Sequence, residues 1–284
     1  MVRKAPMYFD TIVFAGGGNR CFWQAGFWRA LEPALERPPA RLLGVSAGAI
    51  VACGSQASVV ERFLAHHRTV FDGNRRNFHV HELLRGRNPF PQPRIVREGV
   101  DAIFDAEALE RLRSGIPVHV LAARLPARVP TAAASTAVQL AYVVERRVGR
   151  RLHGDWGTRI GFRPHWWAAS GCADAAELRD VLLASCAIPP AFGVQRLAGH
   201  RLMDGGFVGN ALIEFEGVDP GRRLVLVTRE DWAVPVPRDD LVYARPSRKV
   251  PVSKLDSTSG ARIQAAFELG YEDGLAFVHT PTFA

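Results

Sequence analysis

The stretch RLLGVSAGAIVACG, residues 41–54, places one serine where a short apolar run ends and a run of small residues begins. We interpret residues 41–45 as a buried strand and the residues after Ser46 as a helix. A sharp strand-to-helix turn exposes a serine hydroxyl above the carboxyl edge of a sheet, and only small residues fit beside it. Gly44 and Gly48 flank Ser46 at the spacing G-x-S-x-G. The sequence therefore predicts a nucleophilic serine at this turn.

The first 70 residues alternate between strand and helix patterns. Residues 8–15 are predicted as a buried strand, residues 19–36 as a helix and residues 47–70 as a second helix. Such a strand–helix–strand–helix unit implies an α/β fold with a parallel sheet covered on both faces. Further strands are expected at residues 116–125, 201–203 and 224–228, and further helices at residues 131–148, 177–187 and 257–278.

The chain shows no internal repeat and no low-complexity linker, so a single domain over residues 1–284 is expected. Residues 72–113 are rich in arginine, asparagine and proline and lack a clear hydrophobic period. We interpret this segment as a lid or insertion over one end of the sheet. Residues 152–167 are expected to form an irregular, aromatic and basic stretch.

A glycine loop, FAGGGNR at residues 14–20, follows the first strand. The N–H groups of Gly16, Gly17 and Gly18 can point at an anion. Neighbouring parallel strands lie about 4.8 Å apart, so this loop is expected to face Ser46 across the sheet edge. Donors about 3 Å from the developing charge would form an oxyanion hole. A dinucleotide loop is disfavoured, because G-x-G-x-x-G requires glycine at position 21, where Cys21 stands, and no G-K-[ST] follows.

A carboxylate follows a later strand in LMDGGFVGN, residues 202–210. Taken alone, Asp204-Gly205-Gly206 would be an ordinary turn. Beside a serine turn and a glycine loop, Asp204 is better interpreted as a general base for Ser46.

Four blocks in the same order give the chain a resemblance to bacterial patatin-like phospholipases: GGGNR, GVSAG, ASCAIPPAF and DGG, at residues 16–20, 44–48, 184–192 and 204–206. The closing helix with ELGYEDG is also similar. The resemblance implies a three-layer α/β/α sandwich and a Ser46–Asp204 dyad without histidine. It also implies an oxyanion hole from the backbone of Gly16, Gly17 and Gly18 with Arg20 beside it, and hydrolysis of acyl esters of phospholipids, lysophospholipids and neutral lipids.

Two positions depart from the family pattern. Glycine is usual where Cys21 stands, and a cysteine would strain the hole if that position required positive φ. Ser185-Cys186 replaces a Ser-Ser pair, which is a mild change. An aspartate has an ordinary pKa of about 3.9, so it can serve as a base only in a dry site that raises that pKa. His200 lies near Asp204 in sequence and stays an alternative helper.

The charge and cysteine content limit the class of protein. The formal net charge is +8, and arginine carries nearly all of the positive charge. This reflects either coding bias in a GC-rich genome or attraction to an anionic partner such as a phospholipid surface or nucleic acid. Cys21, Cys53, Cys172 and Cys186 form no CxxC pair, which indicates reduced thiols in a cytoplasmic protein. No signal peptide, membrane span, metal-ligand spacing or nucleic-acid motif is found, so no metal, cofactor or nucleic acid is expected.

Two groups of side chains could contact a membrane. The first combines arginines with aromatic residues typical of a membrane interface: Arg146, Arg147, Arg150, Arg151, Trp156, Trp166 and Trp167. A solvated helix end with tryptophans in the core explains this group equally well. The second lies in the 72–113 segment: Arg75, Arg76, Arg85, Arg87 and Phe90. The leading hypothesis is a serine lipid acyl hydrolase, peripheral at the membrane, with an acyl-enzyme intermediate. The alternatives are an acyltransferase with the same dyad, a catalytically weak lipid-binding or scaffold protein, and a charge-driven nucleic-acid binder.

Overall fold

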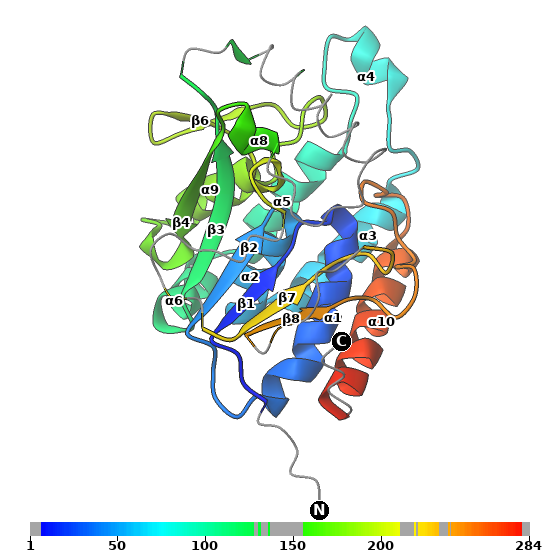
Figure 1. Cartoon of the computed structure of the whole chain (residues 1–284). Helices are drawn as coiled ribbons and strands as arrows, with labels where there is room; N and C mark the ends of the chain where they lie inside the picture. Colours follow the sequence, from blue (N-terminus) through cyan, green and yellow to red (C-terminus); the bar gives the residue numbers. More distant parts are fainter. Residues whose placement is uncertain are drawn as a thin grey trace, which may run out of the picture.

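A computed structural model describes residues 7–127, 130–131, 136, 156–210, 219, 221–232, 238 and 240–279 of the chain (Figure 1). Its centre is the pair of parallel strands β1 (Thr11–Phe14) and β2 (Arg41–Val45). Both strands are apolar and almost wholly buried, which is typical of parallel strands covered on both faces.

The sheet is parallel from its middle to one edge. β3 (Val118–Arg124) pairs with β2, while β7 (Arg223–Leu226) pairs with β1 and β8 (Leu241–Ala244) pairs with β7, all in parallel. The strand order is β5-β6-β3-β2-β1-β7-β8, with β4 also paired to β3. The predicted α/β class with a mainly parallel central sheet is confirmed.

The other edge of the sheet is antiparallel. β4 (Arg163–Ala168) and β6 (His200–Asp204) both pair with β3, and β5 (Gln195–Leu197) pairs with β6. The expectation of an irregular stretch at residues 152–167 was therefore wrong for its second half. A strand with mostly half-exposed side chains shows no apolar run from which a buried strand could be predicted.

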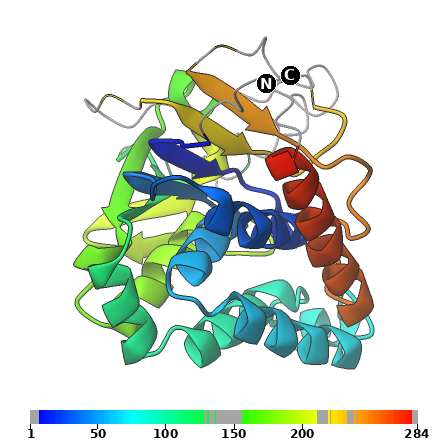
Figure 2. The ribbon, with the colours of Figure 1, turned by 90° about the horizontal axis from the view of Figure 1, so that it is seen from below.

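Apolar side chains alternate between the two faces of the sheet. Ile12 and Phe14 of β1 belong to the main core, whereas Val13 belongs to a smaller cluster on the other face. The helices that supply the main core gather on one side of the sheet in Figure 2. They are α1 (Phe22–Leu31), α2 (Ala47–Gln56), α3 (Val60–Gly73), α5 (Gln92–Ile103), α6 (Ala106–Ser114), α9 (Ala175–Ser185) and α10 (Gly260–His279).

The helix predicted at residues 47–70 is two helices. α2 ends at Gln56 and α3 begins at Val60, and Ser58 between them has φ 56°. A left-handed residue cannot continue an α-helix, so the chain turns there.

The 72–113 segment is more helical than its sequence indicated. It contains α4 (Val80–Leu84), α5 and the greater part of α6. Ile95 and Val100 of α5 and Leu109 of α6 lie in the main core. Only the part before α5 projects from the body in Figure 1. The assignment of this segment as a lid stays a prediction.

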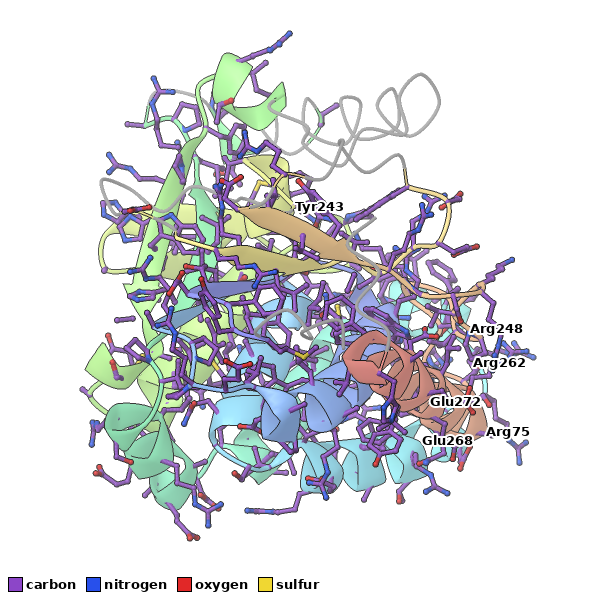
Figure 3. All side chains as sticks on the ribbon, turned by 60° about the horizontal axis from the view of Figure 1, so that its bottom comes forward. Arg75, Tyr243, Arg248, Arg262, Glu268 and Glu272 are labelled. Carbon is purple, nitrogen blue, oxygen red and sulfur yellow. The ribbon has the colours of Figure 1, made fainter. Side chains whose placement is uncertain are left out.

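The strands predicted at residues 116–125, 201–203 and 224–228 and the helix predicted at residues 177–187 lie within a few residues of β3, β6, β7 and α9. α8 (Trp156–Arg159) is a single turn before β4. α10 buries Ile263, Ala266 and Gly270, and Figure 3 shows Arg262, Glu268 and Glu272 along its outer side. The predicted helix at residues 131–148 lies almost wholly outside the described residues, as do Arg146, Arg147, Arg150 and Arg151. No helix in the described ranges is long and apolar enough to cross a membrane.

Candidate active site

Ser46 occupies the turn between β2 and α2. Its φ and ψ are 57° and −136°, a strained conformation for a residue other than glycine. A Cβ on Gly44 would lie 2.4 Å from the Cα of Ala49, and one on Gly48 would lie 2.4 Å from the carbonyl oxygen of Phe14. The two flanking glycines are therefore required by the close approach of β1, β2 and α2, as the sequence predicted.

One edge of β3 brings Ser46 and Asp204 together. Val45, the last residue of β2, pairs with Leu121, and Asp204, the last residue of β6, pairs with Ala122. β4 occupies the opposite edge of β3 along both stretches, so β2 and β6 end against each other on the same edge. The Oγ of Ser46 donates a hydrogen bond of 2.5 Å to Oδ2 of Asp204.

The Asp204 carboxylate is buried, with only 4% of the residue exposed. Its Oδ1 accepts a hydrogen bond of 2.7 Å from the N–H of Gly206. Loss of water by burial raises the pKa of Asp204, against the lowering effects of the Lys254 charge and of the hydrogen bonds from Ser46 and Gly206. A Cβ on Gly205 would lie 2.4 Å from the carbonyl oxygen of Leu121, so the turn after Asp204 also needs glycine.

The glycine loop lies beside Ser46. An added Cβ on Gly16 would come within 3.2 Å of the Ser46 Cβ. The N–H of Gly16 donates to the carbonyl oxygen of Asn210 at 3.3 Å. Within the described ranges, the N–H of Gly18 has no hydrogen-bond acceptor, and the N–H of Gly17 lies against the Cys21 sulfur. Arg20 reaches back along the loop, and its Nε donates to the carbonyl oxygen of Gly17 at 3.4 Å.

Cys21 does not strain this loop, contrary to the concern raised by its sequence position. Its φ and ψ are −66° and −13°, an ordinary helical conformation, and the positive φ of the loop falls on Gly18 at 56°. The thiol is buried and points at the carbonyl oxygen of Ala15, 3.6 Å away. Burial raises the pKa of Cys21 to about 12, so the thiol is protonated and inert.

Sequence reasoning gave no role to Ser185, which holds the backbone of the candidate nucleophile. The Ser46 N–H donates to the Ser185 Oγ at 2.8 Å, and that hydroxyl donates to the carbonyl oxygen of Leu121 at 2.6 Å. Two residues further on, the carbonyl oxygen of Ala187 accepts a hydrogen bond of 3.0 Å from the N–H of Asp204. The block ASCAIPPAF, which in the sequence supported only the family resemblance, therefore holds the backbone of both Ser46 and Asp204 by hydrogen bonds.

Asn210 was also missed. Its Nδ2 donates to the carbonyl oxygen of Gly16 at 3.2 Å, and its own carbonyl accepts from the Gly16 N–H. This double contact fixes the first glycine of the loop beside Ser46. The sequence feature that could have indicated this role is the position of Asn210 at the end of LMDGGFVGN, six residues after Asp204.

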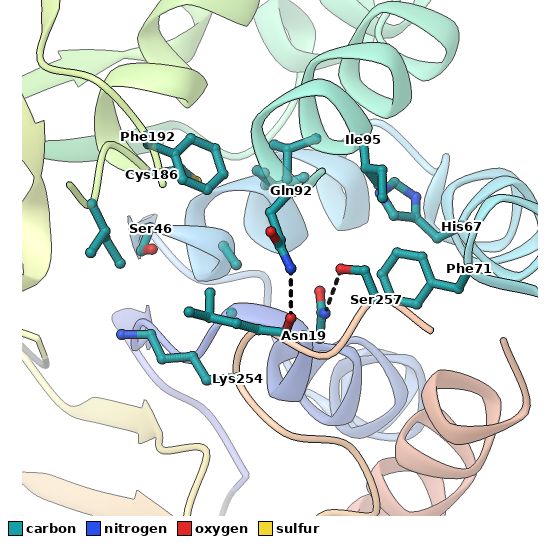
Figure 4. A pocket seen from close by; sticks show the side chains of 16 residues that line it. Asn19, Ser46, His67, Phe71, Gln92, Ile95, Cys186, Phe192, Lys254 and Ser257 are labelled. Carbon is teal, nitrogen blue, oxygen red and sulfur yellow. Dashed lines mark hydrogen bonds between the residues drawn. The ribbon is translucent and has the colours of Figure 1, made fainter. Parts of the chain in front are cut away.

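A pocket opens from Ser46, and about 520 Å³ of space free of atoms lies in and above it, open solvent included. Figure 4 shows Ser46 and Lys254 at one end and His67 and Phe71 at the other. Half of the sixteen residues that line it are apolar: Ala47, Ile50, Phe71, Ile95, Val96, Ile188, Phe192 and Leu255. Such a pocket suits a hydrocarbon chain whose polar end lies at Ser46.

Among the described residues, no histidine lines the Ser46 end of the pocket. His200 lies at the first residue of β6, at the opposite end of the strand from Asp204, and its ring contacts that of His165 at a tilt, with the centroids 5.0 Å apart. His67 lies at the far end of the pocket, where burial lowers its pKa to about 4 and leaves it neutral. Among the described residues no cluster of His, Cys, Asp or Glu could hold a metal ion.

The two tryptophans of β4 are packing residues. Trp166 and Trp167 are half-buried, and both pack against clusters of the core. The arginines that were expected beside them in a membrane-contacting group lie outside the described residues.

Comparison with known proteins identifies the family of the chain. A model of the patatin-like phospholipases matches residues 12–215, a span that includes Ser46, Ser185 and Asp204. The chain belongs to the patatin-like phospholipase family, which is a family of lipid acyl hydrolases. The comparison with curated proteins gives no match. Among solved structures, the chain is similar to VipD from Legionella pneumophila, with 11% identity and a TM-score of 0.43 over 95% of this chain and 67% of that one.

Proposed function

We propose that this protein hydrolyses fatty-acyl esters of phospholipids or lysophospholipids with Ser46 as the nucleophile and Asp204 as the general base. The observation that carries the proposal is the 2.5 Å hydrogen bond from the Ser46 hydroxyl to a buried carboxylate. A base held at this distance can accept the hydroxyl proton as the oxygen attacks.

In the acylation step, the Ser46 Oγ forms a bond to the ester carbonyl carbon and its proton passes to Oδ2 of Asp204. The carbonyl oxygen becomes an oxyanion, which the N–H groups of Gly17 and Gly18 would bind. Arg20 positions the loop through the Gly17 carbonyl. The tetrahedral intermediate collapses, the bond to the leaving alcohol breaks, and Asp204 returns its proton to that oxygen. The acyl group remains on Ser46.

In the second step, water attacks the acyl-enzyme, and Asp204 accepts its proton. The fatty acid leaves and Ser46 recovers its hydrogen through Asp204. Attack by another alcohol in place of water would make the protein an acyltransferase with the same machinery. The raised pKa of Asp204 supports the role of base, because a carboxylate in a dry site takes up a proton more readily than one in water.

The alternative of a catalytically weak lipid-binding protein rested on Cys21. The ordinary backbone of Cys21 removes that reason, because the cysteine neither strains the loop nor displaces Gly17 and Gly18. The proposal also includes a membrane surface as the place of action, since the substrates are lipids.

The proposal is tested with a fluorophosphonate probe and a panel of phospholipids, lysophospholipids and soluble short-chain esters. We expect a covalent adduct on Ser46 and turnover of at least one lipid class. Ser46→Ala should abolish both, and Asp204→Asn should lower kcat/KM by about 10²- to 10⁴-fold. Ser55→Ala, another buried serine on α2, is the matched control and should keep both activities. Equal turnover by wild type, Ser46→Ala and Asp204→Asn would refute the proposal.

A further inference from the structure

Exposed apolar side chains concentrate on the short segment that projects beyond the pocket. We name residues 74–90 the prong; it contains α4. Exposed large apolar residues elsewhere in the described ranges are scattered, but the prong carries four within seven positions: Phe78 at 41%, Val80 at 56%, Leu83 at 54% and Leu84 at 82%. Figure 1 shows α4 standing apart from the helices that pack on the sheet. A cluster of exposed apolar side chains is typical of a surface that contacts a partner or a membrane.

The apolar tip is flanked by positive charge on both sides. Residues 75–87 contain four arginines and one glutamate, a formal net charge of +3 with neutral histidines. Arg75, Arg76, Arg85 and Arg87 are all exposed. Arg85 and Arg87 share Glu82, at 3.4 and 3.7 Å, and Figure 3 shows Arg75 at the margin of the molecule. Leucines between arginines match the interface of an anionic bilayer, where apolar side chains enter the acyl region and arginines meet phosphate groups.

Half-buried polar contacts fix the base of the prong to the rim of the pocket. The Nδ2 of Asn74 donates to the Ser257 carbonyl at 2.7 Å, and Oδ1 of Asn77 accepts from the Ser257 N–H at 2.8 Å. The Nδ2 of Asn88 donates to the Ala191 carbonyl at 2.7 Å. Ser257 lines the pocket directly, and Ala191 precedes Phe192, which also lines it. The base of the prong is thus fixed by hydrogen bonds to residues at the wall of the pocket.

We infer that the prong is a membrane anchor, whose tip at Leu83 and Leu84 inserts into an anionic lipid bilayer and brings the mouth of the pocket to the lipid surface. The inference rests on the proposed function for the lipid that would enter the pocket. It commits to a bilayer over a second copy of the chain or a protein partner, because the arginines beside the leucines complement anionic headgroups.

Vesicle co-sedimentation tests the anchor separately from catalysis. The protein carries Ser46→Ala so that no lipid is consumed, and the vesicles contain phosphatidylcholine with about 30% phosphatidylglycerol. Leu83→Asp with Leu84→Asp should weaken binding at least about tenfold, because two apolar contacts are lost and two like charges face the bilayer. Arg75→Gln with Arg76→Gln should weaken it less and reduce its dependence on salt. Tyr271→Asp with Leu275→Asp, on exposed positions of α10, is the matched control and should bind as the parent does.

Hydrolysis of a soluble short-chain ester is measured for the same substitutions in the chain that retains Ser46. Unchanged hydrolysis with lost vesicle binding supports the anchor, and it also shows that the variant folds. Absence of hydrolysis in every variant, with the vesicle results as expected, would refute the proposed function and leave the anchor standing. Equal vesicle binding by the leucine variant and the control would overturn the anchor, as would a wild-type dimer that the leucine substitutions dissociate without any vesicle binding.

Discussion

The strained backbone of Ser46 depends on one neighbouring hydroxyl. Ser185 is fully buried, and its Oγ accepts from the Ser46 N–H while it donates to the Leu121 carbonyl. Leu121 lies on β3 and pairs with Val45, the last residue of β2. The Ser185 hydroxyl therefore connects the turn at Ser46 to the central sheet. A residue with positive φ remains in place only where its surroundings hold it there.

We predict that Ser185→Ala lowers the free energy of unfolding by about 1–3 kcal/mol, because it leaves a buried N–H and a buried carbonyl unpaired. Ester hydrolysis should fall as well, since the turn at Ser46 loses its support. Denaturant unfolding and kcat/KM on a soluble ester measure the two effects.

The control for this prediction is Ser55→Ala. The Ser55 hydroxyl is buried and has no hydrogen-bond partner among the described residues, so its removal should leave stability unchanged or slightly increased. If Ser185→Ala and Ser55→Ala are equally stable and equally active, the bracing role of Ser185 is wrong.

At the scale of elements, α1 and α10 pack with unusually close backbones. An added Cβ on Gly26 would lie 1.9 Å from the carbonyl oxygen of Phe267, and one on Gly270 would lie 1.9 Å from that of Trp23. The Nε1 of Trp23 also donates to Asp273 Oδ2 at 2.7 Å. Since α1 begins where the glycine loop ends, this packing fixes the helix on which that loop is mounted.

We predict that Gly270→Ala destabilises the protein by about 2–4 kcal/mol, although alanine favours a helix by about 1 kcal/mol over glycine. The added methyl group would force α1 and α10 apart. Gly73→Ala, at the last residue of α3, is the matched control, because a Cβ there has no atom within 4 Å. Thermal unfolding should show the control at or above the wild-type midpoint and Gly270→Ala well below it; similar midpoints for the two variants would contradict the packing argument.

Elements with a strong local pattern were predictable from the sequence. Residues 41–45 were predicted as a strand and form β2 with the same bounds, and α10 differs by a few residues. β4 was missed because Arg163, Pro164 and His165 show no apolar alternation, and the strand forms through its pairing with β3. The break at Ser58 was missed because serine carries no clear signal for positive φ.

At the scale of the whole molecule, the charges that set the pKa of Asp204 come from segments distant in sequence. Lys254 lies in the pocket wall at the Ser46 end, 50 residues beyond Asp204 in sequence. Burial raises the pKa of Asp204, and the Lys254 charge opposes that rise. The Lys254 carbonyl also accepts from the Asn19 N–H at 3.0 Å, so the same residue supports the glycine loop.

We predict that Lys254→Met moves the acidic limb of the pH profile of kcat/KM to higher pH. Asp204 must be ionised to accept a proton, and removal of the nearby positive charge raises its pKa further. Activity at a pH on that limb should therefore fall, and it should recover as the pH is raised.

Lys254→Arg retains the charge and should keep the limb near its wild-type position, and Lys249→Met, at an exposed position, should leave it unchanged. A limb that stays in place in Lys254→Met, with only KM altered, would assign Lys254 to substrate binding and refute its influence on Asp204.

The sequence alone determined the features that depend on local geometry. Gly44 and Gly48 around Ser46, the glycine loop and the apolar strands were readable because backbone strain and burial on both faces restrict which residues can stand there. Only the tertiary structure decided the features that depend on how distant segments meet. Ser46 and Asp204 are 158 residues apart and come together because β2 and β6 end against each other on one edge of β3. The roles of Ser185 and Lys254, the ordinary conformation of Cys21 and the projection of the prong follow from that packing, because strand register and side-chain contacts between remote segments leave no periodic signal in the chain.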